Sequence, residues 1–255
     1  LVLDRPALAR GVVRYAGEPV ALAVAIDDPT AEAAVRLIEV EYEPLPILLT
    51  PTQSLAAVAP LIHEKTNGYK KVLPDIYPEA GTNIASRYRI RKGDAKNALE
   101  SCAHVAARKF SLPPSGHLAM EVHTARAEVS ADGMVTIVTA SQSPFAVRKQ
   151  LSEVFLIPAG NIQIKVPFVG GGFGGKAPAF LEMLALMASR AVGGNAVRLT
   201  VPREQDMTAA PCRQGLEAEI TLGADTDGIL QAAVLTYRLE SGTYTDIAAY
   251  LSKAS

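Results

Sequence analysis

The order of hydrophobic and polar residues predicts a chain of short strands and short helices. Alternating or β-branched runs typical of strands occupy residues 19–26, 39–42, 84–91, 105–112, 124–130, 134–139, 161–166, 197–201, 216–222 and 229–241. Helical spacing of apolar residues occupies 30–38, 53–58, 94–101, 144–155, 178–192 and a short stretch from Pro202. Asp-Gly pairs at 132–133 and 227–228 predict tight hairpins. Hairpins mixed with helices favour an α+β fold over a doubly wound parallel sheet.

Proline and glycine positions divide the chain into two parts. Pro44, Pro46 and Pro51 interrupt the pattern early, and residues 67–80 are loop-like, with Gly68, Pro74 and Pro78. We therefore expect one domain over 1–74, including a linker, and a second over 75–255. The first residues, Leu-Val-Leu-Asp-Arg-Pro, contain neither an initiator Met nor a signal peptide, so we expect a fragment of a longer protein.

Composition narrows the possible functions. The chain has 255 residues, 49% of them hydrophobic and 20% charged, which is typical of a well-cored globular protein. A formal net charge of −1 argues against nucleic acid or an anionic membrane surface as a partner. The two cysteines, Cys102 and Cys212, are far apart, so the chain alone cannot bind an iron–sulfur cluster or a cysteine-based zinc ion. We expect a cytoplasmic location.

Residues 162–176 carry the strongest chemical signal. A β-rich run leads into Gly-Gly-Gly-Phe-Gly-Gly-Lys at 170–176, and a helical pattern follows. Glycines let backbone N–H groups approach a ligand closely, and a helix N-terminus adds partial positive charge. The segment, called the glycine loop below, therefore predicts an anion cradle.

Several ligands suit such a cradle. Gly170, Gly172 and Gly175 fit the dinucleotide pattern, but the acid expected about 20 residues later is absent, because that spacing falls near Asn195. The same loop fits a P-loop, except that Ala177 stands where Ser or Thr would hold Mg²⁺. A glycine-rich turn that packs a helix on a sheet is a further possibility.

A resemblance adds another ligand class. Residues 170–176 resemble the pterin loop of the large subunit of molybdenum hydroxylases, the xanthine dehydrogenase and aldehyde oxidase family. Residues 13–20 (Val-Arg-Tyr-Ala-Gly-Glu-Pro-Val) and 38–46 (Ile-Glu-Val-Glu-Tyr-Glu-Pro-Leu-Pro) look like the second half of its α/β hammerhead domain. Residues 119–121 (Ala-Met-Glu) and 141–144 (Ser-Gln-Ser-Pro) resemble the start of its molybdopterin-binding domain.

The resemblance implies a partial hammerhead domain at 1–74 and the first, mixed-sheet molybdopterin-binding domain at 75–255, truncated at its C-terminal side. It implies a molybdenum ion held by the sulfur atoms of molybdopterin, in mononucleotide or dinucleotide form, and not by protein side chains. The complete enzyme would hydroxylate N-heteroaromatic compounds or aldehydes with oxygen from water. Partners would be a [2Fe–2S] subunit, an FAD subunit and the remainder of the large subunit.

The resemblance also assigns residues. Gln142 would lie beside the molybdenum and donate to its oxo ligand, although it could be an ordinary polar residue before a helix. Phe173 would place its backbone against the metal ligands, with Gly171, Gly172, Gly174 and Gly175 forming the cofactor cradle; its ring could equally plug the loop onto the core. Lys176 would pair with a cofactor phosphate or cap the loop.

Two positions bear on the substrate. Arg213 matches an active-site Arg of purine-hydroxylating relatives, where it stabilises negative charge on the substrate, although a solvated surface Arg is the alternative. Purine oxidisers carry a Glu directly after the loop lysine, and this chain has Ala177. The substrate therefore stays open.

Other functions have weaker support. His117, Glu121 and His123 invite a metal site, but the spacing is loose and no further ligand is evident. No Gly-x-Ser-x-Gly motif indicates hydrolase chemistry. The Gly-Val-Gly-Glu motif that carries the family's general base is absent too, so we expect this chain alone to be inactive. A phosphate- or nucleotide-binding module and an inactive scaffold fragment remain alternatives.

Overall fold

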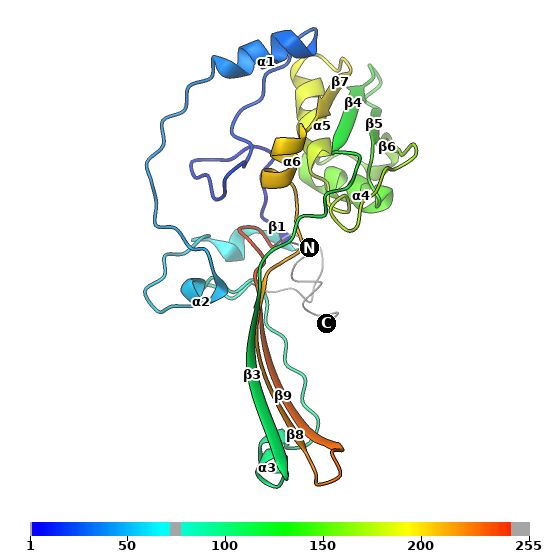
Figure 1. The fold of residues 1–255 in the computed structure, drawn as a ribbon. Coiled ribbons are helices and arrows are strands. Elements are labelled where there is room, and N and C mark those ends of the chain that lie inside the picture. Colours follow the sequence, from blue (N-terminus) through cyan, green and yellow to red (C-terminus); the bar gives the residue numbers. More distant parts are fainter. Residues whose placement is uncertain (1, 72–77, 246–255) are drawn as a thin grey trace. The chain divides into compact units, whose positions relative to one another are not determined.

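The computed structural model describes residues 2–71 and 78–245 (Figure 1). The chain forms two compact units, each built from separate stretches. Unit 1 comprises Leu1–Asp4, Pro46–Ser115 and Gln214–Ser255, and unit 2 comprises Arg5–Leu45 and Gly116–Arg213. The glycine loop lies in unit 2.

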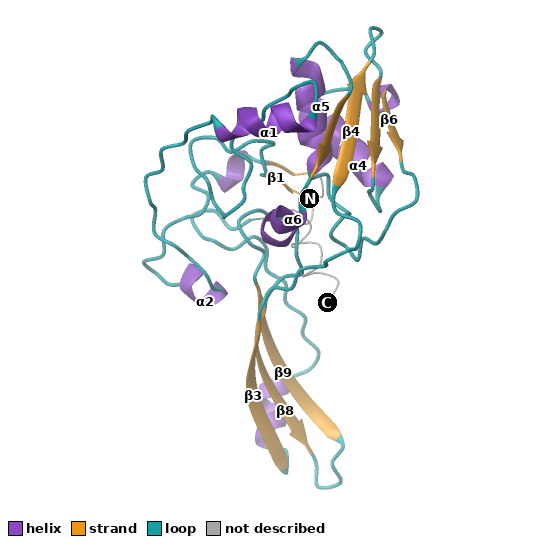
Figure 2. Cartoon of the chain, turned by 45° about the horizontal axis from the view of Figure 1, so that its top comes forward, coloured by secondary structure: helices purple, strands orange, loops and turns teal. Residues whose placement is uncertain are grey.

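Unit 2 contains a four-stranded mixed sheet with the strand order β6-β5-β4-β7 (Figure 2). Strand β4 pairs antiparallel with both β5 and β7, whereas β5 and β6 are parallel. The elements of this unit are α1 (Asp28–Arg36), β4 (Thr124–Val129), β5 (Val135–Thr139), α4 (Pro144–Phe155), η2 (Ala159–Asn161), β6 (Ile162–Lys165), α5 (Leu181–Ala191), β7 (Val197–Thr200) and α6 (Arg203–Ala209).

The core of unit 2 lies between this sheet and its helices. Strand β5 alternates buried and half-buried positions, so Val135 and Ile137 point into the core, where they are 1% and 0% exposed. Helix α5 packs on β4 and β7 and is buried on nearly all sides. Helix α4 packs beside β6 and contributes Val147 and Leu151. This packing holds both ends of the glycine loop, which connects β6 to α5.

Unit 1 contains a three-stranded antiparallel sheet with the order β3-β8-β9. Helix α3 packs against β8 and β9, and the close approach requires a glycine, because a Cβ at Gly223 would lie 2.5 Å from Cys102 Sγ. A short pair, β1 with β2, completes the unit's strands within the described residues. Its elements are β1 (Val2–Leu3), α2 (Pro51–Ser54), η1 (Thr66–Gly68), β2 (Lys70–Lys71), α3 (Ala95–Glu100), β3 (His104–Leu112), β8 (Leu216–Ala224) and β9 (Leu230–Leu239).

The α+β class and the mixed sheet are confirmed, as are both hairpins and the helix at 144–155. The strands predicted at 19–26, 39–42 and 84–91 are wrong for this structure. A strand needs a neighbour to satisfy its backbone groups, and the described residues provide none for these segments. The predicted boundary after residue 74 lies outside the described residues. No helix in the described part of the chain is long and apolar enough to cross a membrane.

Candidate functional site

The glycine loop adopts a strained, tightly folded backbone. Gly171 and Gly174 have φ of 99° and 100°, which glycine adopts without steric cost. Phe173 between them has a φ of 51°, a left-handed conformation that costs a non-glycine residue roughly 1–2 kcal/mol. The Gly175 N–H donates to the Gly172 carbonyl over 2.8 Å and closes the turn. Such strain is typical of functional loops, where the surrounding structure maintains it.

Gln142 is attached directly to this loop. Its side-chain Oε1 accepts a hydrogen bond from the Gly174 N–H over 2.9 Å, and its backbone N–H donates to the Lys176 carbonyl over 3.1 Å. A Cβ at Gly172 would lie 2.5 Å from the same Oε1, so only glycine allows this approach. The structure thus brings Gln142 into contact with the glycine loop, about 30 residues further along the sequence. The bond to Oε1 also turns the amide so that Nε2 is left available as a donor.

The glycine loop also has backbone donors that are not used within the described structure. Among the described residues, the N–H groups of Gly171, Gly172 and Phe173 have no protein acceptor. The Phe173 side chain is 74% exposed, so its ring does not plug the core. Three successive free donors beside a donor amide form a cradle for oxygen ligands or an anion.

Lys176 does not extend toward an external phosphate. Its side chain is 3% exposed, and its Nζ donates to Glu121 Oε2 over 2.8 Å. The same oxygen accepts from the Gly170 N–H over 2.9 Å. Partial burial raises the pKa of Glu121, but hydrogen bonds from Lys176 and Gly170 and the charge of Lys176 outweigh it and hold the pKa below its ordinary value. Of the two roles considered for Lys176, these contacts favour capping of the loop over pairing with a cofactor phosphate.

The start of α5 is separated from the glycines, contrary to the pattern that placed a helix directly after them. The helix begins at Leu181, and the buried carboxylate of Glu182 accepts from the Phe180 N–H over 2.9 Å and from Thr139 Oγ1 over 2.6 Å. The positive end of the helix is therefore neutralised by its own glutamate. The loop's own N–H groups, and not the helix dipole, supply the cradle.

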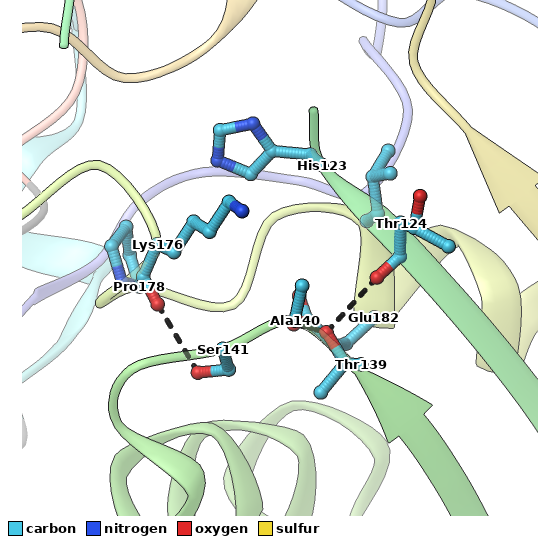
Figure 3. Close-up of a pocket in the computed structure, with 9 residues that line it drawn as sticks. His123, Thr124, Thr139, Ala140, Ser141, Lys176, Pro178 and Glu182 are labelled. Atoms are coloured by element: carbon cyan, nitrogen blue, oxygen red, sulfur yellow. Dashed lines mark hydrogen bonds between the residues drawn. The ribbon is translucent and has the colours of Figure 1, made fainter. Parts of the chain in front are cut away.

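A narrow pocket lies behind the loop. Figure 3 shows Lys176 extending into it below His123, with Ser141 donating to the Lys176 carbonyl over 3.1 Å. His123 contacts two acceptors, Asp206 Oδ1 at 2.7 Å and the Gly175 carbonyl at 3.2 Å. These contacts join strand β4, helix α6 and the glycine loop.

His117 packs against the loop from another side. A Cβ at Gly175 would lie 2.9 Å from its Nδ1, which donates to the Pro211 carbonyl over 3.1 Å. Arg213, two residues further on, is exposed and forms no ion pair within the described part of the chain. Within the described residues, no group of three or more His, Cys, Asp or Glu side chains could hold a metal ion, and this includes His117, Glu121 and His123.

Residue spacing did not reveal the partners of the loop. Glu121, His123, Asp206 and Arg203 lie far from it in sequence, and ordinary pairs of opposite charge carry no signal of their own. Only the short interval from Glu121 to His123 indicated that two of these side chains lie close together.

Comparisons with known proteins agree with this geometry. The family model described as "Molybdopterin cofactor-binding domain" matches residues 76–254, and the model of the aldehyde oxidase and xanthine dehydrogenase a/b hammerhead domain matches residues 2–46. A putative xanthine dehydrogenase molybdenum-binding subunit of Escherichia coli is 30% identical over 241 residues, which is 94% of this chain and 30% of that protein. The nicotinate dehydrogenase large molybdopterin subunit of Eubacterium barkeri is 25% identical over 96% of this chain and 53% of its own length.

A solved structure gives the same result. The quinoline 2-oxidoreductase of Pseudomonas putida matches with a TM-score of 0.76 and 31% identity, over 91% of this chain and 28% of that chain. The chain therefore spans under a third of the first relatives that it matches. With both family models matched in order and the glycine loop built as a cradle, the chain belongs to the xanthine dehydrogenase and aldehyde oxidase family of molybdenum hydroxylases, and it carries that family's molybdopterin cofactor-binding domain.

Proposed function

We propose that this chain forms one side of the molybdenum-cofactor site of an enzyme that hydroxylates N-heteroaromatic compounds or aldehydes. The observation that carries the proposal is the attachment of Gln142 to the glycine loop through the Gly174 N–H. That bond aligns a side-chain donor with the open backbone donors of Gly171, Gly172 and Phe173.

The residues present fit the cofactor. Side chains at 172 or 175 would fill the space now taken by Gln142 and His117, so the loop is shaped to bring bare backbone to its surface. When bound, the molybdenum cofactor supplies the two-electron oxidation and the activation of water. No protein ligand to the metal is required from this chain.

The site residues of this chain would then position the cofactor or interact with it electrostatically. The Gln142 Nε2 would donate to an oxygen ligand of the metal, and the loop N–H groups would donate to the cofactor beside it. Phe173 would bring its backbone close to the metal, held there by Gly172 and Gly174 on either side. Lys176 would stabilise the loop from behind through Glu121 without touching the cofactor.

Arg213 and Ala177 bear on the substrate. Arg213 is exposed and pairs with no acid among residues 2–71 and 78–245, so it is available to stabilise negative charge on a substrate. Ala177 offers no carboxyl group to a purine ring, which favours a heteroaromatic or anionic substrate other than xanthine. Two relatives named for nicotinate and quinoline are consistent with this chemical class.

Electron transfer and full activity would need further components. We propose a [2Fe–2S] and an FAD subunit as partners, with the remainder of the large subunit supplying the other half of the cofactor cage. The Gly-Val-Gly-Glu motif is absent from this sequence, so we propose that the chain alone is inactive. The division into a hammerhead part at 1–74 and a cofactor part at 75–255 stays a proposal.

The test is molybdenum content and pterin fluorescence on the complex purified from its native host through this chain. We expect near-stoichiometric molybdenum and pterin. In the same complex, Gln142→Ala should reduce turnover about 100-fold, as expected for losing one aligned donor, with molybdenum content nearly intact. Absence of both metal and pterin, with bound adenine nucleotide instead, would overturn the proposal in favour of a phosphate site.

A further inference from the structure

A chain of polar contacts reaches the back of the glycine loop from helix α6. Arg203, at the start of that helix, donates through NH2 to the carbonyls of Ala119 and Met120 over 2.7 and 2.8 Å. Its NH1 donates to Asp206 Oδ2 over 2.8 Å. One guanidinium therefore ties the segment before β4 to the acid that faces His123.

The next contacts orient the ring of His123. Asp206 Oδ1 lies 2.7 Å from His123 Nδ1, and the two side chains are only 7% and 14% exposed. His123 Nε2 lies 3.2 Å from the Gly175 carbonyl, which can only accept. Each ring nitrogen therefore faces one oxygen atom, and the contact with the Gly175 carbonyl requires Nε2 to donate. Asp206 is itself held by Arg203.

The ring is also fixed by packing. The edge of His123 meets the Phe180 ring with centroids 5.6 Å apart, and the His123 carbonyl accepts from the Val201 N–H over 3.0 Å. The donor at Nε2 is therefore held in one direction. It points to the carbonyl of Gly175, the residue whose N–H closes the turn on Gly172.

We propose that Arg203, Asp206 and His123 form a positioning relay that sets the conformation of the glycine loop. By holding the Gly175 carbonyl on the buried side, the relay directs the N–H groups of Gly171, Gly172 and Phe173 to the exposed side. The inference rests on the proposed function, because the loop's donors matter only if they face the cofactor. The three residues touch neither cofactor nor substrate, and they act through the loop.

The test uses the assembled enzyme from its native host with His123→Phe, which keeps a ring of similar size beside Phe180 but removes both ring nitrogens. Outer residues of this kind typically change activity about 10–100-fold, and we expect a loss of that size in kcat per bound molybdenum. KM should change less than kcat. His123→Gln retains one donor able to reach the Gly175 carbonyl and should restore most of the rate.

A second readout does not depend on turnover. Hydrogen exchange at the amides of residues 170–176 should be faster in the His123→Phe enzyme, and its molybdenum(V) resonance spectrum should shift. Thr208→Ala is the matched control, because Thr208 lies on the same helix and its hydroxyl bonds, within the described part of the chain, only to the carbonyls of Glu204 and Gln205. It should leave rate, exchange and spectrum unchanged.

The outcomes separate the relay from the proposed function. A wild-type enzyme without molybdenum and pterin would refute the proposed function itself. If the wild type holds its cofactor but His123→Phe lowers only yield or molybdenum content, with kcat per bound molybdenum unchanged, His123 is merely structural and the relay is refuted. Should His123→Phe fail to assemble, Asp206→Asn replaces it, and an unchanged rate and exchange in that variant would refute the relay.

Discussion

Removing the charge of Glu121 should expose how much the glycine loop depends on its buried ion pair. Lys176 is 3% exposed, so Glu121→Gln leaves a buried ammonium group without its counter-ion. Breaking a buried pair on one side costs about 3–5 kcal/mol. Glu121 is itself 35% exposed, so solvent screens part of the interaction, and we expect the lower end, about 3 kcal/mol. For a chain of this size each kcal/mol lowers Tm by roughly 2–4 °C, which gives a decrease of about 6–12 °C.

The assay is thermal unfolding by circular dichroism on three variants. Glu121→Gln with Lys176→Met removes both charges and should recover most of the loss, because a buried methionine needs no counter-ion. Glu128→Gln breaks the exposed pair with Arg126 and should cost less than about 1 kcal/mol. A loss below about 1 kcal/mol for Glu121→Gln, or a double variant no more stable than the single one, would refute the reasoning.

Three further changes test other parts of the site. Gly172→Ala would place a Cβ 2.5 Å from Gln142 Oε1 and should lower molybdenum content several-fold in the assembled enzyme with an unchanged circular dichroism spectrum, whereas Gly160→Ala, in open space, should not. The pKa of Glu121 lies below its ordinary value of 4.5, so its contribution to stability is fully present above pH 4.5 and is lost as the pH falls through the lower folded value. The difference in stability between wild type and Glu121→Gln should therefore be constant from pH 7 to pH 5 and shrink below pH 4.5. A difference that widens on acidification would contradict the assignment. Arg213→Ala should reduce kcat/KM for anionic substrates more than for aldehydes, and equal losses for both would remove its charge-stabilising role.

The sequence predicted well those elements whose signals are local. Helix α4 has the predicted bounds because Pro144 begins it and Leu156 ends it in a left-handed conformation. Both Asp-Gly hairpins form for the same local reason. The strands predicted at 19–26 and 39–42 do not form, because a strand also needs a neighbouring strand, which the spacing of apolar residues does not identify.

The site divides along the same line. The glycine loop and Gln142 were predicted through a resemblance to known motifs, and the structure places them in contact, although their roles stay predictions. The supporting contacts join residues far apart in sequence: His123 and Gly175 are 52 positions apart, and Arg203 and Ala119 are 84 apart. Such pairings are set by the packing of β4, α6 and the loop, and no residue pattern along the chain specifies them.

The order of the chain has a consequence for how the protein folds. Strands β3 and β8 pair Leu112 with Leu216, yet residues 116–213 of unit 2 lie between them in sequence. Closing so long a loop of unfolded chain costs about 4 kcal/mol in entropy before the first strand contact forms. Folding of unit 2 reduces this cost, because the bond from His117 to Pro211 brings the two ends of the insertion together. Unit 2 should therefore fold first, so that β3 and β8 pair only after the unit that contains the glycine loop has formed.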